Sequence, residues 1–122
     1  MTRRLYTPEL ANKSLPLVAR IAADIRRVAN ELRAEFQKLP AAADEDSVPD
    51  RIVALRDEFE ALLGELDQLG VELKDPMTGL LDFRALRDGQ EVYLCWRLEE
   101  PEVGHWHELA AGFAGRRPIA DF

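Results

Sequence analysis

Two runs of apolar residues at heptad spacing constrain the fold of this chain more than any other feature. The first run alternates intervals of three and four residues through Val18, Ile21, Ile25, Val28 and Leu32. The second run keeps the same intervals through Ile52, Leu55, Phe59, Leu62, Leu66 and Leu69. Residues three and four apart lie on one face of an α-helix. The sequence therefore predicts two long amphipathic helices with apolar seams that face each other.

The residues around the first run indicate where its helix begins and breaks. Thr7 places a hydroxyl directly before Pro8 and Glu9, and this order is typical of a helix start. Pro16 lacks a backbone N–H, and its ring clashes with the preceding helical turn. We therefore expect a short helix over residues 8–13, a bend at residues 14–15 and a long helix from Pro16 to Leu39.

The second helix has a clear start and a clear end. Pro49 and Asp50 precede its first seam residue, and Gly70 follows its last one as a left-handed cap. The connection 40–49 holds two prolines and an acidic run without periodicity, so we expect it to be exposed. A connection this short predicts that the two helices form an antiparallel hairpin.

After Gly70 the apolar period changes from helical to two, which is typical of strands. Strands are expected over residues 71–73, 80–83, 91–97 and 103–108. Asp88-Gly89 is a hairpin turn signal, and glycines hold the tail in irregular backbone. We expect a single α+β domain over residues 1–122. In it, a coiled-coil-like hairpin over residues 1–70 packs on a small antiparallel sheet of three or four strands over residues 71–122.

Composition excludes several classes of function. The 23 acids and 16 bases give a net charge of −7, which argues against nucleic-acid binding by general electrostatics. No window approaches the about 20 apolar residues of a membrane-spanning helix, and no signal peptide follows the N-terminal arginines. A single cysteine forms no internal disulfide and favours a reducing compartment. We therefore expect a cytoplasmic protein without a membrane or nucleic-acid partner.

The rare residues gather in the segment 95–117, which holds the cysteine, both tryptophans and both histidines. Candidate ligand-binding residues in and near this segment are Asp82, Cys95, Trp96, Trp106, His107, Glu108 and Arg116. For the two tryptophans we favour core packing, because an indole suits the junction of a sheet with helices. No complete catalytic or metal-binding signature is present, so the sequence leaves any cofactor undefined.

A zinc site is one interpretation of these residues. His105 and His107 lie on one side of the expected strand, and Cys95 on a neighbouring strand would add a third ligand. The paired ligand spacing typical of structural zinc sites is missing. We therefore favour a Cys95 that packs as a small hydrophobe and a His107 that is hydrogen-bonded.

Two further interpretations involve the same segment. Cys95 with His107 and an acid, Glu108 or Asp82, would form a nucleophile, a base and its orienting group. Cys95 lies in mid-strand without a cationic sequence neighbour, so we assign no catalytic residue. Arg116 follows glycines that suit anion binding, but we favour an ion pair with Asp82, Glu108 or another acid of the chain.

Several longer motifs together carry a family resemblance. They are Tyr6-Thr7-Pro8-Glu9, Leu69-Gly70-Val71-Glu72-Leu73-Lys74-Asp75, Gly79-Leu80-Leu81-Asp82-Phe83, Cys95-Trp96-Arg97, Trp106-His107-Glu108 and Gly112-Phe113-Ala114-Gly115-Arg116. Through them the chain resembles the domain of unknown function 2203 family of bacterial proteins. The resemblance implies the helical hairpin and the bacterial cytoplasm, and it implies no activity. The family pattern requires no histidine at position 105, which favours His107 over His105 as a site residue.

Two functional hypotheses follow. The first is a small, non-enzymatic homodimer or higher homo-oligomer, because two helices and a small sheet leave more apolar surface than one hairpin covers. The second is a small-molecule or metal-binding protein, with or without enzymatic activity, whose site lies around Cys95, His107, Glu108 and Arg116.

Overall fold

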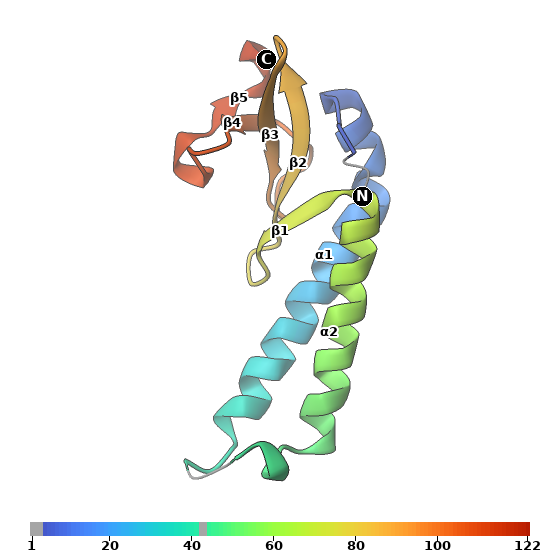
Figure 1. Ribbon diagram of the computed structural model, residues 1–122, viewed down its shortest axis with the longest axis vertical. Coiled ribbons are helices and arrows are strands. Elements are labelled where there is room, and N and C mark those ends of the chain that lie inside the picture. Colours follow the sequence, from blue (N-terminus) through green and yellow to red (C-terminus); the bar gives the residue numbers. More distant parts are fainter. Residues whose placement is uncertain (1–3, 42–43) are drawn as a thin grey trace.

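The computed structural model describes residues 4–41 and 44–122. The fold is α+β, as predicted: two long helices pack on one face of a five-stranded antiparallel sheet (Figure 1). Residues 1–3, and residues 42–43 of the predicted exposed connection, lie outside the described residues. Neither helix is long and apolar enough, within the described part of the chain, to cross a membrane.

Helix α1 spans Pro8–Gln37 without a break, so the predicted bend at residues 14–15 is wrong. The start is as expected, because the Thr7 hydroxyl accepts a hydrogen bond from the backbone N–H of Leu10 at 3.1 Å. Pro16 lies inside the helix with its side chain exposed. A proline there costs about 3 kcal/mol or more in an isolated helix, so contacts from outside the helix must offset this cost.

Asn12 provides the contacts that hold the first turns of α1 in line. Its Oδ1 accepts a hydrogen bond from the backbone N–H of Val103 at 2.7 Å, and its Nδ2 donates to the carbonyl of Pro8 at 2.9 Å. Ala11 beside it is fully buried against the core. The turn before Pro16 is therefore fixed by distant parts of the chain, which a local sequence pattern does not reveal.

Helix α2 spans Asp50–Leu69 and ends at Gly70, whose φ of 72° is the predicted left-handed cap. A short 3-10 helix, η1 (Glu45–Ser47), precedes α2. The two long helices run side by side in opposite directions (Figure 1). Most of the seam positions are buried and the rest are half-buried; the fully buried ones are Val18, Ile21, Ile25, Val28, Ile52, Leu55, Leu62 and Leu66.

The sheet has five strands, not the three or four that we predicted. They are β1 (Val71–Asp75), β2 (Leu80–Arg87), β3 (Gln90–Trp96), β4 (His105–Glu108) and β5 (Arg117–Pro118). Each strand pairs antiparallel with the next in chain order. The β2–β3 turn is the predicted Asp88-Gly89, with φ of 53° and 81°. Strand β5 was missed because two residues, one of them proline, are too short to show an alternating pattern.

The register of the strands gives the sheet two different faces. Leu81, Phe83 and Ala85 of β2 point to the helices, and they pair with Trp96, Leu94 and Val92 of β3 on the same side. The intervening residues point the other way because side chains alternate along a strand. This second side, here called the polar face, carries Glu72, Lys74, Asp82, Arg84, Tyr93, Cys95, His105 and His107. The core lies between the helices and the first face, so the polar face is free to carry a site.

Candidate functional site

Three polar-face residues from three neighbouring strands meet at one point. Asp82 on β2 is paired with Cys95 on β3, and His107 on β4 is paired with Tyr93, two residues before Cys95 and therefore the next position on the same face. A carboxylate oxygen, the thiol sulfur and a ring nitrogen lie within 4.8 Å of one another. The three residues are only 3%, 1% and 2% exposed. We refer to Asp82, Cys95 and His107 as the buried triad.

The hydrogen bonds of His107 fix its orientation in the triad. Its Nδ1 lies 2.7 Å from the backbone carbonyl oxygen of Glu108, and its Nε2 lies 3.1 Å from Oδ2 of Asp82. A carbonyl oxygen only accepts, so Nδ1 carries a hydrogen and donates it. One further proton lies between Nε2 and Oδ2, on either the imidazole or the carboxyl group.

Asp82 combines burial with an unused oxygen. Burial raises the pKa of its carboxyl above the ordinary value, and the attraction of His107 offsets only part of this effect. Its Oδ1 is buried and makes no hydrogen bond to any described residue. Unsatisfied polar atoms are rare in folded proteins, and each calls for an explanation. This oxygen is suited to accept a hydrogen bond from a ligand or to bind a cation.

Cys95 is not an activated nucleophile in this arrangement. Burial and, to a smaller extent, the nearby Asp82 carboxylate together raise the pKa of its thiol to about 12, although Arg116 offsets a part of this effect. The thiolate is the nucleophilic form of cysteine. The thiol stays protonated at neutral pH, so the geometry does not support nucleophilic attack by Cys95.

A small pocket of about 200 Å³ opens over the buried triad. Its wall combines apolar and polar side chains with one glycine: Lys74, Leu80, Asp82, Tyr93, His107, Leu109, Gly112 and Phe113. The ammonium of Lys74 and the hydroxyl of Tyr93 both bond to Oε1 of Glu72, at 3.1 and 2.9 Å. We call this hollow the sheet pocket. Asp82 and His107 reach its wall, whereas Cys95 lies behind them.

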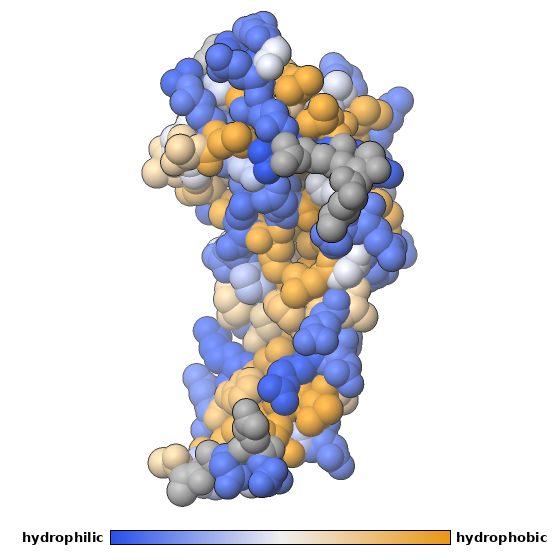
Figure 2. All heavy atoms as spheres, in the orientation of Figure 1, coloured by the Kyte–Doolittle hydropathy of each residue, from blue (hydrophilic) through white to orange (hydrophobic). Residues whose placement is uncertain are grey.

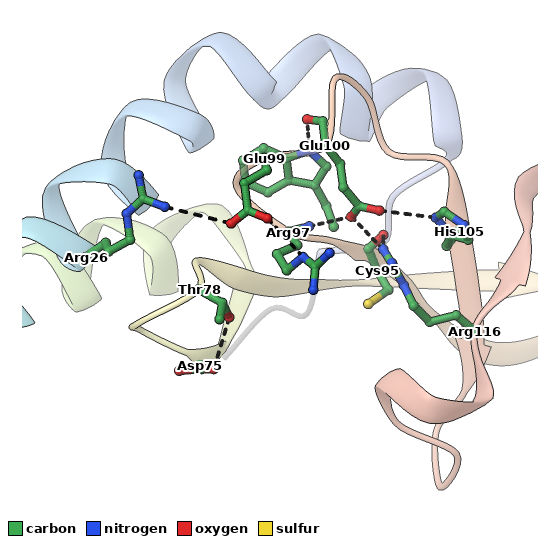
Figure 3. Close-up of polar contacts among 10 residues, drawn as sticks. Arg26, Asp75, Thr78, Cys95, Arg97, Glu99, Glu100, His105 and Arg116 are labelled. Atoms are coloured by element: carbon green, nitrogen blue, oxygen red, sulfur yellow. Dashed lines mark hydrogen bonds and ion pairs between the residues drawn. The ribbon is translucent and has the colours of Figure 1, made fainter.

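Arg116 belongs to a second cluster of polar side chains on the same face, together with Glu100 and His105 (Figure 3). Its Nη2 donates to Oε1 of Glu100 at 2.6 Å and to the carbonyl of Cys95 at 3.1 Å. The backbone N–H of Arg97 donates to the same Glu100 oxygen at 2.7 Å. We call Arg116 with Glu100 the tail clasp, because it joins the segment before β5 to the end of β3.

The tail clasp bears on two sequence-based expectations. Arg116 was expected to pair with Asp82, Glu108 or another acid of the chain, and its partner is neither of the two named acids but Glu100, because the returning tail brings Arg116 to the loop after β3. His105 was a candidate ligand, with Cys95 and His107, only in the zinc interpretation that we did not favour. It shares their face, but its Nδ1 lies 3.5 Å from Glu100, and Asp82 stands in the buried triad instead.

A family comparison agrees with the predicted resemblance. A family model described as "Uncharacterized conserved protein (DUF2203)" matches residues 4–119. The chain belongs to the DUF2203 family. No curated protein and no solved structure matches it.

The remaining predicted site residues of this DUF2203 chain lie away from the sheet pocket. Trp96 and Trp106 are buried on the face toward the helices, and the indole N–H of Trp96 donates to the carbonyl of Glu100 at 3.0 Å. Glu108 is exposed, and its carboxylate lies 3.9 Å from Arg117. It points to the opposite side of β4 from His107, because the two are adjacent in a strand. Of the predicted set, Asp82, Cys95 and His107 meet in the buried triad, and Arg116 contacts the triad through the backbone carbonyl of Cys95.

Sequence reasoning missed several residues of the sheet pocket in this DUF2203 chain. Tyr93 had a detectable signal, because the alternation along β3 places it on the same face as Cys95. Lys74 and Leu80 needed the register between strands β1 and β2. Leu109 and Phe113 come from the irregular segment after β4, which no periodic pattern describes.

Proposed function

We propose that the protein binds a small organic molecule in the sheet pocket. The observation that carries this proposal is Asp82, which lines the hollow and whose Oδ1 is buried without a hydrogen-bond donor among the described residues. The ligand would donate an N–H or O–H to this oxygen and place a short apolar part against Leu80, Leu109 and Phe113. The volume of about 200 Å³ is below the roughly 300–1,000 Å³ of pockets for drug-sized ligands, so the molecule is small.

A fragment screen with methyl-labelled protein tests the pocket. Small amides, alcohols and amines are expected to shift the NMR signals of the Leu80 and Leu109 methyl groups. Asp82→Ala should abolish these shifts, because the acceptor is removed. Asp82→Asn should keep them, since its amide can donate to Nε2 of His107 while its carbonyl oxygen faces the pocket.

The matched pair of Asp82 variants makes the result decisive. Circular dichroism of each variant checks that the fold is retained. Fragment shifts that survive Asp82→Ala, or a screen without any shift at Leu80 and Leu109, would contradict the proposed site.

We also propose that the chain associates with a second copy of itself, and that the two helices, as a coiled-coil-like hairpin, supply the surface. The supporting observation is an apolar area at the start of α1, where Leu5, Leu10 and Leu17 are 43%, 51% and 48% exposed. A groove of about 440 Å³ lies beside it, lined in part by Leu5, Tyr6, Leu10 and Leu69. Figure 2 shows apolar residues in a band along the helices. Exposed apolar patches of this kind are typical of interfaces.

Light scattering on a sizing column tests self-association. Wild-type protein at micromolar concentration is expected to have at least twice the chain mass of 13.8 kDa. Leu10→Glu combined with Leu17→Glu should return it to the mass of one chain, because charges then replace the apolar contact. Val53→Glu, at an exposed apolar position of α2, is the control and should leave the mass unchanged. A wild-type mass of 13.8 kDa would rule the proposal out.

We infer a bacterial cytoplasmic setting and no nucleic-acid partner. The family resemblance and the single cysteine support the setting. The net charge of −7 supports the absence of a nucleic-acid partner.

A further inference from the structure

We propose that the buried triad of Asp82, Cys95 and His107 is a three-ligand site for Zn²⁺ at the base of the sheet pocket. The inference rests on the proposed function, in that the same pocket is taken as the binding site. The zinc site goes beyond the proposed function in two ways. It includes a cation, which binding of an organic ligand does not require, and it includes Cys95, which does not line the sheet pocket.

The spacing of the three donor atoms suits one small cation. Ligand atoms around a tetrahedral zinc ion lie roughly 3.3–3.8 Å apart, given bonds of about 2.0–2.3 Å. The three donor atoms of the triad are within 4.8 Å of one another, and the shortest described separation is 3.1 Å between Nε2 of His107 and Oδ2 of Asp82. Side-chain movements of up to about 1 Å bring these atoms to the separations of a tetrahedral zinc site. Adjacent hydrogen-bonded strands hold their backbones, so the site is built before a cation enters.

The surroundings of His107 are those of a metal ligand. The Nδ1–H donates to the carbonyl of Glu108, so Nε2 is the ring nitrogen that faces Asp82 and Cys95, and it can bind a cation once the proton between Nε2 and Oδ2 is released. Histidines that bind metals commonly donate their other N–H to a carbonyl or carboxylate, which fixes the tautomer and the ring orientation. Arg116 donates to the backbone carbonyl of Cys95 at 3.1 Å and so helps to hold β3 at this ligand.

The unused oxygen of Asp82 is the second, independent observation. A triad that served only as a hydrogen-bonded structural element would satisfy both carboxylate oxygens, yet Oδ1 is buried without a partner. A bound cation gives the carboxylate a partner through either oxygen. When Zn²⁺ binds, the Cys95 thiol releases its proton to solvent as the metal–sulfur bond forms, and the two positive charges of the ion then balance one carboxylate and one thiolate.

The donor types select the class of cation. One sulfur, one nitrogen and one oxygen suit zinc and chemically similar divalent transition metals. Calcium and magnesium prefer sites made of oxygen atoms alone. Asp82 and His107 also line the sheet pocket, so a fourth coordination position faces the hollow. Three protein ligands with one open position is the pattern of zinc sites that bind a further molecule.

Cobalt(II) titration of metal-stripped protein tests this proposal. Co²⁺ replaces Zn²⁺ in such sites and gives visible bands for tetrahedral coordination and a near-ultraviolet band for a thiolate ligand. We expect both bands to saturate at one Co²⁺ per chain and to disappear when Zn²⁺ is added. Cys95→Ser should abolish the thiolate band and weaken Co²⁺ binding at least about 100-fold. Asp82→Asn should weaken binding by a similar factor, because an amide oxygen carries no charge.

Control variants separate the possible outcomes. His105→Ala removes a histidine of the same face that lies outside the triad, and it should bind Co²⁺ like the wild type. Circular dichroism confirms that each variant is folded. Wild-type protein without the thiolate band, or a band that Cys95→Ser keeps, would overturn the zinc site. Fragment binding that persists in Asp82→Asn without Co²⁺ binding in the wild type would reject the zinc site alone and leave the proposed pocket intact.

Discussion

Replacing Phe83 with alanine is expected to lower the free energy of unfolding by about 3–5 kcal/mol, the usual cost of removing a buried aromatic ring. Phe83 lies in the middle of β2 on the face toward the helices and is fully buried. Its ring packs edge-to-face on Tyr6 with centroids 5.0 Å apart. Loss of the ring leaves a cavity between the sheet and the start of α1, which the surrounding backbone is too constrained to fill.

Leu86→Ala is the matched control for this change. Leu86 lies on the same strand but on the opposite side of the sheet, where its side chain is 46% exposed. Urea unfolding of both variants is expected to show a loss of no more than about 0.5 kcal/mol for Leu86→Ala. Equal losses at the two positions would contradict the assignment of the two faces.

Breaking the tail clasp should have the second large effect. Arg116→Ala is expected to lower the free energy of unfolding by about 1–3 kcal/mol, because a charged group of Glu100 loses its partner in a largely buried place. The two side chains are only 11% and 17% exposed. Arg27→Ala is the control and should change stability much less, since Arg27 forms exposed ion pairs with Glu31 and Glu58, and water and salt screen such pairs.

The effect of Arg116→Ala should also depend on pH. Burial raises the pKa of the Glu100 carboxyl, but hydrogen bonds from Arg116 and from the Arg97 backbone outweigh burial and hold this pKa below its ordinary value. A lowered pKa in the folded state stabilises the fold above the unfolded pKa, and this contribution is lost as the pH falls through the folded pKa. The difference between wild type and Arg116→Ala should therefore be full at neutral pH and shrink below about pH 4. A difference that is the same at both ends of this range would contradict the ion pair.

The positions of both helices could be predicted from local sequence patterns. The unbroken path of α1 through Pro16 could not, because it depends on tertiary contacts. The buried positions Val18 to Val28 and Ile52 to Leu66 agree with the heptad spacing, since one apolar side of each helix faces the other. Gly70 ended α2 as predicted, because only a left-handed residue suits that cap. Pro16 did not break α1, because Asn12 is anchored to Val103, which is 91 residues away. No local propensity contains such a contact.

The candidate site was predictable as far as strand alternation extends. Alternation places Cys95 and His107 on one face, and the register of β2 with β3 adds Asp82. The sequence indicates that register only indirectly, because the position of the Asp88-Gly89 turn determines which residues of β2 and β3 pair. The partner of Arg116 was not predictable, because the segment between β4 and β5 is irregular and its path decides which acid Arg116 meets.

Native mass spectrometry tests most directly whether the polar face of the sheet is a binding site. The protein is incubated with one equivalent of Zn²⁺, passed over a sizing column and measured beside Cys95→Ser treated in the same way. We expect one zinc ion on each wild-type chain of 13.8 kDa and none on each Cys95→Ser chain. A bare wild-type chain, or equal zinc on both proteins, would contradict the zinc site.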